Sequence, residues 1–173
     1  MELQKRKPNR LSNYDYSSGG YYFITICTAQ KQKILCNVVA PLTPDNQSDI
    51  GVGEGLRALP LCKPPKTILT DIGKAVNESI NYINENYSNT KVDKYIIMPN
   101  HIHLIIRITG GHGDPPLQNV IGGIKSYTTK IYGKTLWQRS FYDHIIRDEK
   151  DYMRICEYIE NNPQKWAEDK YYI

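Results

Sequence analysis

The feature of this sequence that most constrains its fold is a pair of strand-like segments joined by a very short connection. Residues 91–98 (KVDKYIIM) and 102–108 (IHLIIRI) are rich in β-branched and apolar residues, and the connection between them is built on Pro99 and Asn100. A parallel pair of strands needs a crossover of a dozen residues or more. The short connection therefore predicts an antiparallel hairpin.

Further elements flank this hairpin on both sides. Residues 21–28 (YYFITICT) and 141–147 (FYDHIIR) have the composition of strands. Thr70 is a candidate helix N-cap, and the apolar residues after it recur at spacings of four, four, three and four, which predicts an amphipathic helix. These apolar residues are Ile72, Val76, Ile80, Ile83 and Tyr87.

Two more helices are expected, over residues 117–131 and from Asp148 to Asn162, where Pro163 ends the second. The resulting order is strand, helix, strand, strand, helix, strand, helix. This order predicts an α+β, ferredoxin-like antiparallel sheet with helices on one face and an extra C-terminal helix.

The length of 173 residues fits a single domain over residues 1–173. Residues 1–20 form a basic N-terminal arm. Residues 37–66 hold five of the ten prolines and three of the twelve glycines, so we expect a long loop or an insertion there.

Neither the membrane nor the export pathway is suggested by the sequence. The longest apolar stretches, Tyr21–Cys27 and Ile102–Ile106, are far shorter than the roughly 20 residues of a membrane helix, and no apolar segment follows the charges of MELQKRKPNR. We therefore expect a cytoplasmic protein, associated with the nucleoid if it binds DNA. Cys27, Cys36, Cys62 and Cys156 are irregularly spaced and are expected to be reduced thiols.

Basic residues are concentrated in two parts of the chain. The net charge is +4, which weakly suggests a nucleic-acid partner, although a solvated basic surface has the same composition. The residues expected to bind DNA are Lys5, Arg6, Lys7, Arg10, Lys125, Arg139 and Arg147.

His101 and His103 are the strongest chemical signal. At positions i and i+2 of a strand they project from the same face, roughly 7 Å apart at Cα, and two imidazoles at that spacing can converge on one metal ion. Ile102, Leu104 and Ile106 point to the opposite face, towards the core. The motif is short, so two unrelated polar residues near a strand end remain an alternative.

The last helix supplies a second set of polar side chains. Its buried stripe is expected to contain Tyr152, Ile155, Cys156 and Ile159, and Tyr158 lies about 110° from the centre of that stripe. Asp151 and Asn162 lie close to Tyr158 in angle. If this edge faces the histidine strand, a metal site with a phenol beside it results; otherwise Tyr158 is a surface tyrosine and Asn162 a helix-end residue.

The segments MPNHIHLIIRI and LWQRSFYDHIIRDEKDYMRICEYIENNPQKW resemble the REP-associated tyrosine transposases, the domesticated branch of the IS200-like, single-tyrosine HUH transposases. The segment RLSNYDYSSGGYYFITICT resembles the N-terminal strand region of the same family. The resemblance covers most of the chain except residues 37–66.

The resemblance implies a function and a set of site residues. His101 and His103 match the metal ligands, Asn162 matches a third metal-directed side chain, and Tyr158 matches the nucleophile. The implied enzyme uses Mg²⁺ or Mn²⁺ and cleaves single-stranded DNA beside hairpins of repetitive extragenic palindromes, leaving a 5′-phosphotyrosine and a free 3′-OH. The implied partner is single-stranded or hairpin DNA. A site built from the strand and helix of one chain would permit a monomer, and a helix exchanged with a neighbouring chain would require a homodimer.

Competing assignments remain at this level. Tyr127 is a second candidate tyrosine, although packing and contact with the DNA backbone suit it better, and Tyr152 is expected in the core. His144 could be a structural histidine, and His112 lies in a glycine-rich loop that lacks the GxxxxGK[ST] pattern of a nucleotide-binding loop. A non-catalytic protein that binds DNA hairpins on the same fold is the main alternative function. A 2H-type phosphoesterase is disfavoured because it needs two separate His-x-Ser/Thr motifs.

Overall fold

The computed structural model describes residues 19–39, 65–109 and 117–168. Strands β1 (Gly20–Cys27), β4 (Thr90–Ile97), β5 (His101–Ile108) and β6 (Tyr142–Ile146) form one sheet in the order β4-β5-β1-β6. Every neighbouring pair in that sheet is antiparallel. This is the predicted ferredoxin-like arrangement, and the hairpin across Pro99 and Asn100 is its β4–β5 pair.

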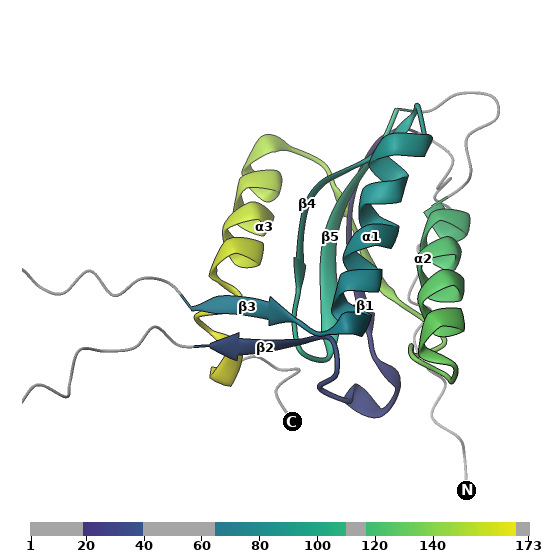
Figure 1. Cartoon of the computed structure of the whole chain (residues 1–173). Coiled ribbons are helices and arrows are strands. Elements are labelled where there is room, and N and C mark those ends of the chain that lie inside the picture. Colours follow the sequence, from purple (N-terminus) through teal and green to yellow (C-terminus); the bar gives the residue numbers. More distant parts are fainter. Residues whose placement is uncertain (1–18, 40–64, 110–116, 169–173) are drawn as a thin grey trace, which may run out of the picture.

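The three α-helices of the described ranges cover the two faces of the sheet unequally (Figure 1). Helices α1 (Asp71–Asn86) and α2 (Leu117–Tyr132) lie side by side on one face, and α3 (Glu149–Asn161) lies on the other. The predicted N-cap is confirmed, since the Thr70 side chain accepts a hydrogen bond from the Gly73 amide at 3.1 Å. Asp148 caps α3 in the same way, through the Asp151 amide.

Alternation along the strands sends side chains into two separate cores. Ile102, Leu104 and Ile106 of β5 belong to the larger core beneath α1 and α2. Ile105 belongs to a smaller core, with Phe23 and Ile146 from the sheet and Ile155, Cys156 and Ile159 from α3. His101 and His103 of β5 lie four and two residues before Ile105, so their side chains project from the same face of the sheet as Ile105 and face α3.

The expected loop over residues 37–66 is wrong at its two ends. β2 (Cys36–Val39) and β3 (Lys66–Leu69) pair as an antiparallel ribbon that projects from the body of the protein (Figure 1). Four-residue strands are too short to give a readable alternation, and the adjacent prolines obscured them. The remainder of that segment, residues 40–64, lies outside the described residues, as does the basic arm up to residue 18.

Within the described ranges, no helix is both long enough and apolar enough to cross a membrane. Cys27, Cys36 and Cys156 form no disulfide there, and Cys62 lies outside these ranges.

Candidate functional site

The turn that precedes His101 is fixed to a distant part of the chain. The carbonyl oxygen of Pro99 accepts from the amides of Ile34 and Leu35, at 2.9 and 3.0 Å, and that of Asn100 accepts from the amide of Thr28 at 2.8 Å. These bonds join the β4–β5 turn to the segment after β1. The start of β5, where the histidines lie, is therefore built into the framework of the fold.

Asn100 fixes the tautomer of the His101 ring. The Asn100 side-chain amide donates to the carbonyl of Lys31 at 3.3 Å, which turns its Oδ1 towards Nδ1 of His101, 2.9 Å away. An amide oxygen only accepts, so Nδ1 must carry the proton and the lone pair of the neutral ring lies on Nε2. In this tautomer Nε2 is the nitrogen that can accept a proton or bind a metal ion.

His103 connects the sheet to α3. Its Nδ1 lies 2.9 Å from the hydroxyl of Thr25, its cross-strand neighbour, and its Nε2 lies 3.3 Å from the hydroxyl of Tyr158. The ring stacks on Phe23, with centroids 5.2 Å apart. The rings of His101 and His103 are 4.5 Å apart, and both residues are buried. The edge of α3 that carries Tyr158 therefore faces the histidine strand of the same chain. Of the two alternatives for Tyr158, this is the one in which it lies beside the histidines rather than as an isolated surface tyrosine.

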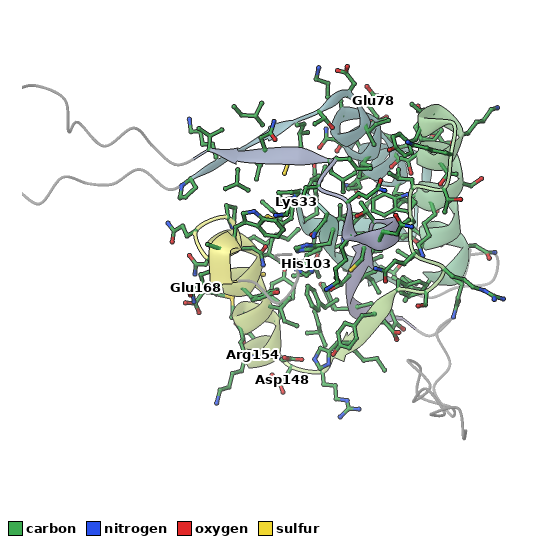
Figure 2. All side chains as sticks on the ribbon, turned by 90° about the horizontal axis from the view of Figure 1, so that it is seen from below. Lys33, Glu78, His103, Asp148, Arg154 and Glu168 are labelled. Carbon is green, nitrogen blue, oxygen red and sulfur yellow. The ribbon has the colours of Figure 1, made fainter. Side chains whose placement is uncertain are left out.

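Tyr158 is 39% exposed and lies on the wall of a groove of about 740 Å³ between α3 and the sheet. His103 and Thr25 line the floor of the groove, and Asn162 lines it from the end of α3. In Figure 2, His103 lies beside α3, and Glu78 of α1 lies on the opposite side of the sheet. A molecule entering the groove would thus meet a phenol and an imidazole together.

The three residues predicted to bind a metal ion, His101, His103 and Asn162, are all buried, and His103 and Asn162 line the same groove. Among the described residues no cluster of three or more His, Cys, Asp and Glu side chains could hold one. His101 and His103 supply two imidazoles, and the buried amide of Asn162 is the third candidate ligand. A site of this kind leaves positions for substrate oxygens, which a catalytic metal requires.

A second polar cluster, which the sequence did not reveal, lies in the same groove. Nε2 of His144 is 2.7 Å from one carboxylate oxygen of Asp151, and Arg154 donates to the other at 2.6 Å. The hydrogen bonds from Arg154 and His144 lower the pKa of the Asp151 carboxyl. The i, i+3 spacing of Asp151 and Arg154 was a signal for their pair. Nothing in the sequence linked His144 to α3.

The structure gives several predicted residues other surroundings. The ammonium group of Lys125 donates to the carbonyls of Gln138, Arg139 and Ser140, at 2.9, 3.3 and 3.1 Å, and burial lowers its pKa. Arg139 and Arg147 are exposed. Tyr127 lines a hollow between α1 and α2, on the face opposite the histidines.

Other predicted residues lie outside the described ranges or fit their expected place. Lys5, Arg6, Lys7, Arg10 and His112 belong to segments the structure does not describe. Tyr152 packs against the smaller core, as expected, and burial raises its pKa to about 12.

Comparison with known proteins identifies the family. Residues 61–162, more than half of the chain, match the family model described as "Transposase IS200 like". The chain belongs to the IS200-like transposases. It is also 32% identical to an uncharacterised protein of Haemophilus influenzae, over 99% of this chain and 95% of that protein.

Two further comparisons concern the REP-associated branch of the IS200-like transposases. The REP-associated tyrosine transposase of Escherichia coli is 33% identical over 76 residues, which cover 43% of this chain and 45% of that protein. The solved structure of a REP-associated tyrosine transposase bound to a REP hairpin superposes with a TM-score of 0.60 at 21% identity, and covers 94% of this chain and 76% of that chain. The second similarity confirms the fold.

Proposed function

We propose that this IS200-like transposase is a metal-dependent enzyme that nicks and rejoins single-stranded DNA beside hairpins, with Tyr158 as the nucleophile. The observation that carries the proposal is the contact between the Tyr158 hydroxyl and His103 Nε2, at 3.3 Å, in an open groove next to a second histidine. The solved structure of a REP-associated tyrosine transposase, which is bound to a REP hairpin, supports a hairpin as the substrate, and the E. coli relative of the same name supports a REP-associated role.

The proposed step exchanges one phosphoester for another. The phenol oxygen of Tyr158 attacks the phosphorus, the bond from phosphorus to the 3′-oxygen breaks, and the proton lost by the phenol is balanced by the one gained by the 3′-oxygen. The products are a 5′-phosphotyrosine and a free 3′-OH. Because the number of phosphoester bonds is unchanged, the DNA can be rejoined by the reverse reaction.

A phenol has an ordinary pKa near 10 and is a poor nucleophile at neutral pH without help. A divalent cation polarises the phosphate and stabilises the charge that develops on it. His101, His103 and Asn162 would hold Mg²⁺ or Mn²⁺, and imidazole ligands suit Mn²⁺ better than Mg²⁺. The rings of Phe23 and Tyr158 pack against the His103 ring and fix its plane.

DNA affinity is expected to be largely electrostatic and to fall with salt. The exposed Arg139 and Arg147 and the four cations of the N-terminal arm are the candidate phosphate contacts. Lys125 remains a candidate, but its ammonium group already holds the loop of residues 138–140.

The test is a denaturing gel of end-labelled, single-stranded hairpin oligonucleotides incubated with wild type, Tyr158→Phe or Tyr127→Phe, each with Mn²⁺ or with EDTA. We expect a covalent protein–DNA adduct that requires the metal and is lost, by at least about 10³-fold, only in Tyr158→Phe. Tyr127→Phe is the matched control, because Tyr127 is as exposed but lies on the far face.

An adduct that survives in Tyr158→Phe would refute the proposed nucleophile. If wild type forms no adduct on hairpins that it binds, the protein is a non-catalytic hairpin-binding protein instead.

A further inference from the structure

The groove continues beyond Tyr158 towards the edge strand β6. On that side its lining includes Tyr142 and His144 from the sheet and Arg154 and Glu157 from α3. None of these residues has a part in the proposed chemistry.

The register of the sheet places these side chains relative to the histidines. Thr25 of β1 lies opposite His103 on one side and Tyr142 on the other, so these three residues form one row across the sheet. His144 lies in the next row, opposite Phe23, and points to the same face as Tyr142, roughly 7 Å away at Cα. Tyr142 and His144 therefore extend the floor of the groove away from the site by two strand spacings, about 10 Å.

Tyr142 offers a base-sized aromatic surface. Its side chain is 50% exposed, although it belongs to the sheet rather than to a loop. An exposed ring on a rigid strand is the usual platform for stacking an unpaired base, and such stacking tolerates any base.

The cluster of His144, Asp151 and Arg154 offers donors to an anion. Both oxygens of Asp151 are occupied, one by each neighbour, so the carboxylate holds the imidazole and the guanidinium side by side. Arg154 is 69% exposed and has further N–H groups to donate. Glu157 is the opposing charge in this part of the groove, and Lys165 and Glu168 lie at the other end.

We propose that this end of the groove is a nucleotide subsite for the single strand next to the scissile phosphate, in which Tyr142 stacks on the base and Arg154 binds the phosphate. Asp151 and His144 are positioning residues in this arrangement, since His144 holds Asp151 and Asp151 holds Arg154. The inference rests on the proposed function for its substrate class. Asp151 lies seven residues before Tyr158, which is about 10 Å along α3. The cluster of His144, Asp151 and Arg154 therefore lies beyond the phosphate that Tyr158 attacks and beside a neighbouring phosphate of the same strand.

The test measures binding rather than cleavage. In a Tyr158→Phe background, the affinity for a labelled hairpin with a single-stranded extension is compared with that for the same hairpin without it. Tyr142→Ala, Arg154→Gln and His144→Gln are each added, with Tyr82→Ala and Lys150→Gln as controls. Tyr82 is exposed on the far face, and Lys150 is an exposed cation of α3 outside the groove.

We expect Tyr142→Ala to weaken binding of the extended hairpin roughly 5- to 150-fold and to leave the bare hairpin unaffected. Arg154→Gln should reduce the slope of log affinity against log salt by about one, for the extended hairpin alone. In a further experiment, a single abasic site is moved along the single-stranded extension. It should weaken binding by the Tyr158→Phe protein at one position of the extension, and it should have no effect at that position when Tyr142→Ala is added.

The proposal is overturned if the three variants bind the extended hairpin as the parent does, or if they lose both hairpins equally, since that pattern indicates damage to the fold. The outcome is independent of catalysis. Absence of an adduct in the wild type would refute the proposed function and leave the binding result standing. Unchanged binding by the variants would refute the subsite and leave the proposed function standing.

Discussion

Asn100 is the residue on which the tautomer of His101 depends, and with it the proposed role of this ring as a metal ligand. Its side-chain amide joins Nδ1 of His101 to the backbone carbonyl of Lys31. The amide therefore fixes both the orientation of the imidazole ring and the position of its proton on Nδ1. Partners of this kind raise the basicity of a ligating imidazole and fix its plane.

Replacing Asn100 by Ala should therefore weaken metal binding without removing a ligand. We expect the Mn²⁺ concentration for half-maximal adduct formation to rise about 10- to 100-fold, and the affinity for Mn²⁺ measured by calorimetry to fall by the same factor. Asn86→Ala, an exposed amide at the far end of α1, is the control. An unchanged Mn²⁺ dependence in Asn100→Ala would show that the tautomer is set in another way.

At the scale of elements, the strands of the main sheet and all three helices could be predicted from the sequence. Long amphipathic patterns and clear caps mark α1 and α3, and the apolar strands alternate with them. The ribbon of β2 and β3 could not be predicted, because its strands have four residues each and Cys36 is the one buried residue among them.

The candidate site was predictable only in part, for a similar reason. His101, His103 and Tyr158 could be proposed from spacing and from the resemblance, and the contact between His103 and Tyr158 confirms that their elements meet. The link between His144 and Asp151 depends on how α3 lies over β6, which no local pattern encodes. Asn100 was assigned only to a turn, since its second partner, Lys31, is 69 residues away.

Gly73 marks the place where α1 meets the segment that supports the histidine turn. A Cβ atom there would lie 2.0 Å from the carbonyl oxygen of Leu35, which also accepts hydrogen bonds from the amide and the hydroxyl of Thr70. Gly73→Ala must therefore displace backbone, and we expect it to lower the free energy of unfolding by about 1–3 kcal/mol in urea denaturation.

Gly123 of α2 is the matched control for Gly73. A Cβ atom there meets nothing within 4 Å, so Gly123→Ala should raise the free energy of unfolding by roughly 0.5–1 kcal/mol through helix propensity. Equal effects of the two substitutions would contradict the close approach of α1 to Leu35.

At the scale of the whole molecule, the sheet separates two cores of unequal size. Among the residues that the structure describes, nineteen buried ones form the core under α1 and α2, and six form the core under α3. The helix that carries Tyr158 is therefore held by the smaller part of the apolar interior, supplemented by the polar contacts of Asp151 with His144 and of Glu160 with Lys94.

This asymmetry predicts that α3 opens without global unfolding. In native-state hydrogen exchange, the amides of α3 should exchange at a lower free energy than the central amides of α1 and β5. His144→Ala should lower the opening free energy of α3 and leave that of α1 unchanged. Protection of α3 equal to the global value would show that the two cores unfold as one.

The ribbon of β2 and β3 has a consequence for engineering this protein. Its two strands leave the body side by side, with Val39 opposite Lys66, so the points at which an inserted sequence would begin and end are already paired. The entropy of closing a loop grows only slowly with its length, so a spacer or reporter domain introduced between these ends should disturb the rest of the fold little. The end of the ribbon is therefore a suitable place to insert a fusion partner without changing either terminus.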